Sequence, residues 1–541
     1  MNFIFHNGRV ITVDRDNDSA TAVAVEGNKI FAVGSDDEIL ELGGDRTELI
    51  DLGGKSLLPG FNDSHLHLVG YALTAAKVDL RHCKSIEQVV SEIKNFISEG
   101  KVEKGQWVLG WGWDHGLFKE KRMPDRRVLD RAAPENPLSI MRTCCHICSV
   151  NTSALRKAGI LINPPTLDGG SVETDEEGAP TGVLKEKAMQ LVMNLIPPAD
   201  TDMLKGLIKS AARDFLAAGL TSVQTDDLAA LGSEKLPELI EAYQDLESSG
   251  NLGLRINLQP LLMTVDELKS FLELGYKTGQ GSEFFKIGPL KLLTDGSIGG
   301  RTALLSAPYN DSIDNCGIAV LSRHELEKLV ELAHRNGMQV ASHAIGDAAI
   351  DMVLGVYEDV NRRYLRSDPR FRIIHASVVR QDLLERFSSQ GVIADIQPSF
   401  IPSDNALVDL HLGMERASWT YRWKDFVDCG IITACGTDCP VENYEPLATI
   451  NAALTRQDMN GNPPGGWFPD QKLSLADTLH MYTLGSAYCS FEEDIKGSIT
   501  AGKLADMVVL SGDITAKEPE VIKDLKVDLT MVGGEIAFRR Q

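Results

Sequence analysis

Six side chains with metal-binding chemistry stand in or at the ends of short apolar runs, spread from residue 65 to residue 438 of a 541-residue chain. Such runs are typical of buried parallel strands, whose carboxyl ends meet at one mouth of a barrel. Side chains far apart in the sequence can therefore gather round one metal site. The six are His65, His67, Lys291, His343, His375 and Asp438.

The apolar runs alternate with amphipathic helices, which predicts an α/β fold of the (β/α)8 TIM barrel type. One helix is marked at both ends, because Ser322 and Glu325 form a capping-box signature and Gly337 ends the apolar periodicity. The strand candidates are residues 58–65, 220–224, 254–262, 284–293, 338–342, 371–375, 391–397 and 430–436.

Both chain ends carry hairpin signals, which predict a small β-sandwich domain formed by the two termini. The turn pairs Asn7-Gly8, Gly27-Asn28 and Gly533-Gly534 each separate two short apolar runs. The stretch between the first two barrel strands is too long for a simple connection, and a periodic helix at residues 86–96 indicates an inserted α+β subdomain that serves as a lid. The expected domains are residues 1–58 with 492–541 (β-sandwich), 59–70 with 201–491 (metal-dependent barrel) and 71–200 (lid).

Composition disfavours several classes of partner. With 54 basic against 77 acidic residues the net charge is −23, which argues against nucleic acid. The sequence has no run of about 18 uncharged apolar residues for a membrane span, and its start lacks the features of a secretion signal. We therefore expect a cytoplasmic protein without a membrane partner, with a homodimer as the reasonable assembly.

The nine cysteines are scattered along the chain, as reduced thiols of a cytosolic protein are. The cluster Cys144-Cys145-His146-Ile147-Cys148 resembles a zinc site but lacks a second ligand pair at a useful spacing. A partly buried strand with inert thiols is the favoured interpretation.

His65 and His67 are two residues apart, so in a strand both imidazoles lie on the same side and can bind one cation. Lys291 in an apolar strand has three possible states. It can reach solvent, it can pair with Asp295, or its neutral amine can take up carbon dioxide as a carbamate that bridges two metal ions. The presence of several histidines in similar strands favours the carbamate, because a carbamate and imidazoles can bind the same metal ions.

His343, His375 and Asp438 each have a simpler explanation when taken singly. The two histidines can be satisfied core residues, and Asp438 can cap a helix. Their shared position at strand ends favours metal ligation instead, because residues with unrelated structural roles would seldom all stand at corresponding strand ends. Imidazoles and carboxylates together suit zinc best, with manganese, iron, cobalt or nickel as alternatives.

Several motifs resemble the amidohydrolase superfamily in its two-metal form: the segment Leu58-Pro-Gly-Phe-Asn-Asp-Ser-His-Leu-His67, the lysine, the two later histidines and the closing Asp438. More narrowly, Lys291–Ala303, Gly110–Asp114, Pro180–Val183 and Gly497–Asp506 resemble the branch that includes N-substituted formamide deformylase. The resemblance spans essentially the whole chain. Thr437 and Thr294 depart from the more frequent Ser and Ala.

The resemblance implies a role for each ligand. His65 and His67 with Asp438 would hold one divalent metal, and His343 with His375 the other. Lys291, carbamylated by carbon dioxide, would join the two ions together with a bridging hydroxide. Asp438 would be the catalytic residue, accepting the proton of the attacking hydroxide and passing it to the departing nitrogen.

Five residues are candidates for substrate binding. Arg301 can clamp a carboxylate or carbonyl, although capping a loop through backbone carbonyls is an equal alternative, and Asp295 can be its partner. Trp113 and Asp114 can roof the pocket together with Trp111, or belong to the core of the inserted subdomain. His146 is the fifth candidate.

The expected function is hydrolysis of a carbon–nitrogen bond in a small-molecule amide, N-acyl amine or N-formyl amine. A mononuclear deaminase that leaves Lys291 unmodified is the alternative enzyme. A catalytically silent barrel that binds partners is the alternative from another class, and the presence of all six ligands argues against it.

Overall fold

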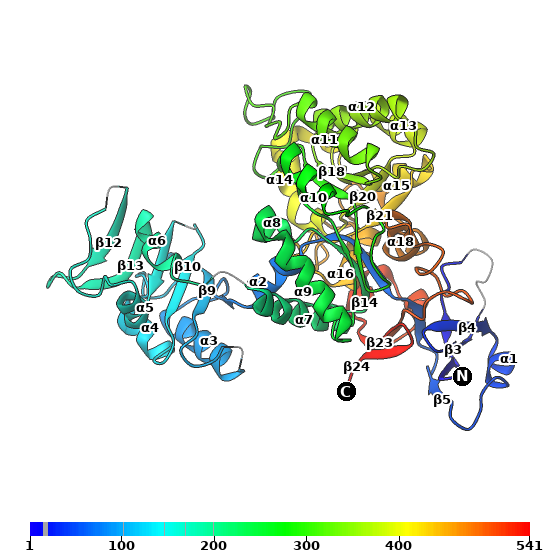
Figure 1. The fold of residues 1–541 in the computed structure, drawn as a ribbon, viewed down its shortest axis with the longest axis horizontal. Helices are drawn as coiled ribbons and strands as arrows, with labels where there is room; N and C mark the ends of the chain where they lie inside the picture. Colours follow the sequence, from blue (N-terminus) through cyan, green and yellow to red (C-terminus); the bar gives the residue numbers. More distant parts are fainter. Residues whose placement is uncertain (15–19, 101, 145, 168, 198–199) are drawn as a thin grey trace. The chain divides into compact units, whose positions relative to one another are not determined.

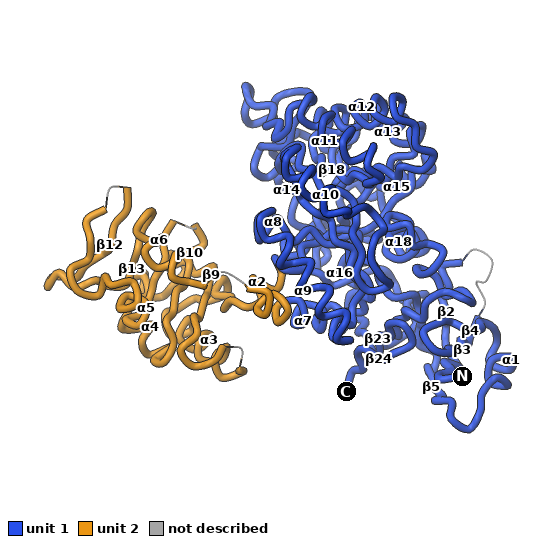
Figure 2. The backbone as a smooth tube through the Cα atoms, viewed as in Figure 1, with its two compact units in different colours: residues 1–70, 208–541 blue, residues 71–207 orange. Residues whose placement is uncertain are grey.

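The computed structural model describes residues 1–14, 20–100, 102–144, 146–167, 169–197 and 200–541. These residues form two compact units, one of residues 1–70 with 208–541 and the other of residues 71–207 (Figure 2). The two units are described separately below.

Parallel strands form the centre of the first unit, in two sheets with the orders β16-β15-β14-β7 and β17-β18-β19-β20-β21. Every neighbouring pair within these sheets is parallel. The strands are β7 (Phe61–Leu66), β14 (Leu220–Thr225), β15 (Arg255–Leu258), β16 (Phe285–Ile287), β17 (Leu290–Leu293), β18 (Val340–Ala344), β19 (Arg372–His375), β20 (Ile393–Ile396) and β21 (Thr433–Cys435).

The predicted strand at residues 284–293 is divided between the two sheets, β16 in one and β17 in the other. The break falls at Gly288-Pro289, where proline has no N–H to donate to a ladder. Gly288 also approaches the neighbouring strand closely, since a Cβ there would lie 2.0 Å from Asn257 Oδ1. Continuous apolar character alone did not reveal this interruption.

Backbone hydrogen bonds connect the two sheets on both sides. Lys291 N donates to Pro260 O at 2.9 Å, just beyond β15. On the other side, Asp438 N donates to His65 O at 2.8 Å, which places the end of β21 beside the end of β7. The ends of the first and last parallel strands therefore lie side by side.

Helices connect the strands, and Figure 1 shows α11, α12 and α13 gathered around β18 and β20. The predicted capping box is confirmed: Ser322 precedes α11, and both reciprocal hydrogen bonds with Glu325 are present. The longer helices of this unit are α9 (Leu236–Ser248), α10 (Val265–Glu273), α11 (Arg323–Arg335), α12 (Asp347–Arg363), α13 (Gln381–Gln390), α14 (Phe400–Ala417) and α16 (Pro446–Thr455).

Strands from the two chain ends share a sheet of order β2-β6-β22-β23-β24, in which β6 pairs antiparallel with β22. A second sheet, β4-β3-β1-β5, comes from the N-terminal segment. The strands are β1 (Phe3–His6), β2 (Arg9–Val10), β3 (Ala22–Glu26), β4 (Lys29–Gly34), β5 (Glu48–Asp51), β6 (Ser56–Pro59), β22 (Met507–Leu510), β23 (Val527–Val532) and β24 (Glu535–Arg539).

Two of the three predicted hairpins are confirmed, β3 with β4 and β23 with β24. The hairpin at Asn7-Gly8 is wrong, because β1 and β2 belong to different sheets. There the chain crosses from one sheet to the other, and β2 pairs with β6 in parallel. A turn pair between two short apolar runs is thus compatible with a crossing as well as with a hairpin.

The second unit contains a sheet of order β12-β13-β11-β10-β9-β8 with helices α3 (Ile86–Ser98), α4 (Arg126–Ala132) and α5 (Thr152–Lys157). The predicted helix is confirmed as α3, which buries Ile86, Val89, Val90, Ile93 and Phe96. The strands are β8 (Val78–Asp79), β9 (Val108–Trp113), β10 (Leu138–Arg142), β11 (Ile147–Val150), β12 (Gly170–Thr174) and β13 (Pro180–Glu186). Among the described residues of the whole chain, no helix is long and apolar enough to cross a membrane.

The cysteine-rich segment of this unit is only partly the predicted strand. β11 begins at Ile147 and includes the buried Cys148, whose pKa is raised by burial to about 12. Cys144 lies in the preceding turn. Burial raises the pKa of Cys144, but the His146 backbone N–H and the Arg142 guanidinium lower it by more, so its pKa lies below the ordinary value of a thiol. Cys145 lies outside the described residues.

Candidate metal centre

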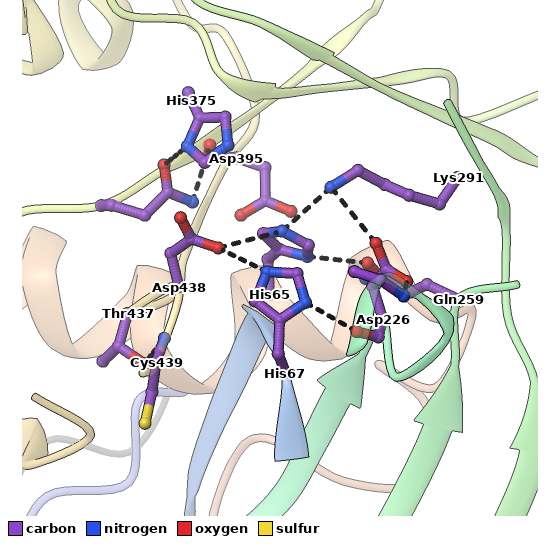
Figure 3. Close-up of polar contacts among 12 residues, drawn as sticks. His65, His67, Asp226, Gln259, Lys291, His375, Asp395, Thr437, Asp438 and Cys439 are labelled. Carbon is purple, nitrogen blue, oxygen red and sulfur yellow. Dashed lines mark hydrogen bonds and ion pairs between the residues drawn. The ribbon is translucent and has the colours of Figure 1, made fainter. Parts of the chain in front are cut away.

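His65, His67 and Asp438 bring their ligand atoms within 4.8 Å of one another. Asp438 Oδ1 lies 3.0 Å from His67 Nε2 and 3.3 Å from His65 Nε2. The histidines come from the end of β7 and Asp438 from the loop after β21, which the backbone bond between Asp438 and His65 holds together. Figure 3 shows both imidazoles turned toward this carboxylate.

Lys291, on β17, reaches the same cluster from another side (Figure 3). Its Nζ lies 3.0 Å from His65 Nε2 and 4.0 Å from Asp226 Oδ2, and its side chain is only 1% exposed. The carboxylate beside it is Asp226 rather than Asp295, and the amine does not reach solvent. Burial lowers the pKa of Lys291, which favours the neutral amine.

His343 and His375 complete the set. Their ring centroids are 4.6 Å apart, and the centroid of His375 is 5.9 Å from that of His65. His343 stands in β18 and His375 at the end of β19. All six expected ligands therefore lie in one cluster, in or just after five parallel strands.

The ring orientation of three histidines is set by oxygen acceptors on Nδ1. Gln259 Oε1 lies 2.8 Å from His65 Nδ1, the Asp226 carbonyl oxygen 2.6 Å from His67 Nδ1, and Gln397 Oε1 2.9 Å from His375 Nδ1. A ring that donates from Nδ1 carries its free lone pair on Nε2, the atom that ligates a metal. Free imidazole nitrogens around a carboxylate oxygen form a donor set that fits a divalent cation.

Sequence reasoning missed these three acceptors. Each of the three is the first residue after a parallel strand: Asp226 follows β14, Gln259 follows β15 and Gln397 follows β20. The available signal was a polar residue just beyond an apolar run, because such a residue can accept a hydrogen bond from a neighbouring metal ligand.

Burial shifts the protonation of two of the imidazoles, those of His65 and His375, in the direction that ligation needs. It lowers the pKa of His65, and it lowers the pKa of His375 further, together with the nearby His343. Both rings are therefore neutral at pH 7, as metal binding requires. For His67 burial also lowers the pKa, but Asp438 raises it by more, to about 9.

The backbone at two ligands lies in the left-handed region. The φ angle is 76° at His375, 43° at the adjacent Ala376 and 59° at Asp438. Such angles are costly for residues other than glycine and persist where the surroundings determine them, commonly at functional sites.

Arg301 and Asp295 do not pair with each other as the sequence suggested. The Arg301 guanidinium pairs with both oxygens of Asp311, the closest contact being 2.7 Å, and not with Asp295. The Asp295 carboxylate accepts the backbone N–H groups of Leu304, Ile345 and Gly346 and lies 3.4 Å from His343 Nε2. With a fully buried side chain engaged in this way, Asp295 anchors the loop after β17 and is not available to a substrate.

The remaining substrate-contact candidates belong to the second unit. Trp113 is 0% exposed in the core of that unit and donates from Nε1 to Ile140 O at 3.0 Å, which favours the core alternative over the pocket roof. Asp114 pairs with Arg142 at 2.8 Å. His146 is exposed and lies 3.1 Å from Glu186.

A family model described as "Amidohydrolase family" matches residues 48–538, which is most of the chain. This chain belongs to the amidohydrolase family. The putative amidohydrolase YtcJ of Bacillus subtilis (strain 168) is 33% identical to it over 541 residues, which cover 100% of both proteins. The N-substituted formamide deformylase of Arthrobacter pascens is 29% identical, over 99% of this chain and 98% of the relative. These matches confirm the branch indicated by the sequence motifs.

Among solved structures, an uncharacterized metal-dependent hydrolase from Pyrococcus furiosus resembles this amidohydrolase with a TM-score of 0.75 and 29% identity. The match covers 96% of this chain and 99% of that one. Together with the family match, it gives this amidohydrolase a TIM-barrel-like α/β fold.

Proposed function

We propose that this amidohydrolase is a metal-dependent hydrolase of carbon–nitrogen bonds in small amides, N-acyl amines or N-formyl amines. One observation carries the proposal: six donor side chains from five parallel strands and the loops after them lie in one cluster, and oxygen acceptors fix the Nδ1 atoms of three of the histidines. Histidines that served only to fill an apolar core would not need hydrogen bonds that fix which ring nitrogen is free. The similarity to an N-substituted formamide deformylase supports a carbon–nitrogen bond as the target, and the similarity to a metal-dependent hydrolase supports the use of metal; each relative is 29% identical.

The ligands divide into two sets. His65, His67 and Asp438 would hold one divalent cation, and His343 and His375 a second, with zinc favoured by the donor types. Lys291, buried and disposed toward its neutral form, would join the sets as a carbamate formed with carbon dioxide. Cations bound there would polarise the substrate carbonyl and lower the pKa of water.

Asp438 is the residue best placed to move the proton. Burial raises its pKa, but the contacts with His65 and His67 lower it by more, well below the usual range, so the carboxylate is ionised at neutral pH. An ionised carboxylate can accept a proton from attacking water and return it to the departing nitrogen. Its position in a loop at the strand ends leaves it on the side where barrel enzymes bind substrate.

The proposal includes a closed barrel of eight parallel strands. The backbone bonds from Lys291 to Pro260 and from Asp438 to His65 support closure, since they join the two sheets at both edges. The strands from both termini would then form the β-sandwich domain, and the unit of residues 71–207 the inserted subdomain.

Metal analysis combined with a substrate panel tests the proposed function. Protein loaded with zinc should contain about two ions per chain and hydrolyse members of a panel of formamides, N-acyl amines and cyclic amides. One ion per chain with release of ammonia from aminated rings would instead indicate a mononuclear deaminase. Metal-loaded protein that leaves the whole panel unchanged would contradict the proposal and favour a binding protein.

A further inference from the structure

The carboxylate of Asp63 connects the end of the first parallel strand to the residue before Asp438, so it contacts the backbone beside two of the proposed metal ligands. It is 0% exposed and stands on β7, two residues before His65. Thr437, next to Asp438, donates to it from Oγ1 at 2.7 Å and from its backbone N at 3.1 Å. The His65 backbone N–H donates to the other oxygen at 3.1 Å.

A fourth donor comes from a separate segment, because the Tyr482 hydroxyl lies 3.3 Å from Asp63 Oδ2. Tyr482 is fully buried. Its ring makes an edge-to-face contact with Phe61, which lies on β7 like Asp63, with the ring centroids 5.6 Å apart. We call the contacts of Asp63 with Thr437, Tyr482 and the His65 N–H the Asp63 clasp.

The strand ends are unusually close where the clasp holds them. A Cβ at Gly436 would lie 2.6 Å from His65 N and 2.9 Å from Asp63 Oδ1, so glycine is needed there. Two residues later Asp438 has a φ of 59°. Asp438, which has the strained backbone, therefore directly follows Thr437, which donates two hydrogen bonds to Asp63.

We propose that Asp63 is a positioning residue that sets the separation between His65 and Asp438, so that both can bind the same cation. The inference rests on the proposed metal centre and adds a residue to it. One carboxylate accepts the N–H of the first ligand and both donors of the residue before the last ligand. Displacing either partner would move one ligand relative to the other.

A purely structural role makes a different prediction. If the clasp only joined two strands, its loss would lower the free energy of unfolding while the folded protein kept its metal affinity. A positioning role requires that metal affinity fall by more than the loss of stability explains. Contacts that orient metal ligands from outside the ligand set typically contribute 10- to 100-fold in metal affinity or activity.

Thr437→Val tests this distinction, because it removes the Oγ1 donor to Asp63 with little change in side-chain volume and leaves Asp63 in place. It also removes the bond that Oγ1 accepts from Cys439 N at 3.2 Å. Thr437→Ser restores the hydroxyl. Thr530→Val is the matched control, since Thr530 is also fully buried and donates from Oγ1 to Leu216 O at 2.7 Å, in β23 away from the centre. Zinc dissociation constants from chelator competition, urea unfolding and, for active protein, kcat and KM are measured for all three and the wild type.

We expect Thr437→Val to bind zinc about 10- to 100-fold more weakly, with kcat reduced more than KM is changed, and Thr437→Ser to recover most of the loss. Thr530→Val should lose comparable stability and keep wild-type zinc affinity. Wild-type zinc affinity in Thr437→Val, or an equal loss in Thr530→Val, would overturn the proposal. If the wild type binds zinc but cleaves no carbon–nitrogen substrate, the proposed function fails while the zinc affinities still decide the role of Asp63.

Discussion

Lys291 Nζ lies 3.0 Å from His65 Nε2, and the side chains of both residues are 1% exposed. Two cations at this distance in a buried setting would repel strongly, so at most one of these groups is protonated. Burial lowers the pKa of each. A neutral amine at this position has the lone pair that reaction with carbon dioxide requires.

Carbamate on Lys291 is therefore the first prediction. Zinc-loaded protein prepared in 13C-labelled bicarbonate should give a carbamate carbon signal by NMR, and Lys291→Met should lack it. Lys286→Met is a suitable control, because Lys286 pairs with Glu492 at 2.6 Å and should leave the signal unchanged. A wild-type spectrum without the signal, from protein that contains two zinc ions, would contradict the carbamate.

Asp438→Asn should lower kcat by about 100- to 10,000-fold, because the amide can neither accept the proton of attacking water nor return it to the leaving nitrogen. Steady-state kinetics on the best substrate of the panel measures the effect. Asp266→Asn, at a side chain 97% exposed, should retain wild-type activity. Full activity in Asp438→Asn would exclude Asp438 as the catalytic residue.

Asp506→Asn should destabilise the protein by about 3 to 5 kcal/mol, since it leaves a buried guanidinium without its counter-charge. Arg255 on β15 holds Asp506 through contacts of 2.6 and 2.9 Å, and both side chains are at most 4% exposed. Urea unfolding compares this variant with Asp359→Asn, whose ion pairs with Arg323 and Arg362 are partly exposed. The control should lose less than about 1 kcal/mol, and equal losses would contradict the argument.

Glu492 should make stability depend on pH. Burial raises its pKa, but Lys496 and Lys286, both at 2.6 Å, lower it by more, to about 2. Because the folded pKa lies below the ordinary 4.5, this stabilisation is complete above pH 4.5 and is lost as the pH falls toward 2.

Glu492→Gln should accordingly destabilise the protein at pH 7 by about 3 kcal/mol, because it breaks a buried ion pair. The difference in the free energy of unfolding between variant and wild type should narrow as the pH falls from about 5 to about 3. Urea titrations across this range measure it. A difference that stays constant with pH would show that the charge of Glu492 is not the cause.

Local sequence patterns correctly predicted the elements that depend only on contacts between residues close together in the sequence. The capping box at Ser322 and the apolar periodicity at residues 86–96 both specify helices, because hydrogen bonds and packing between near neighbours determine them. The Asn7-Gly8 hairpin failed because the two strands pair with distant segments. The break at Gly288-Pro289 depends on close approach to Asn257, which no local pattern contains.

The sequence by itself determined the chemistry of the centre: which imidazoles, amine and carboxylate stand at strand ends, and the family to which they belong. Only the tertiary structure decided which nitrogen is free in three of the four imidazoles, through Gln259, Asp226 and Gln397, and which carboxylate sets the ligand spacing. The physical reason is that a metal site requires lone pairs directed to one point. Those directions depend on hydrogen bonds between residues as far apart as Asp63 and Thr437, separated by 374 positions.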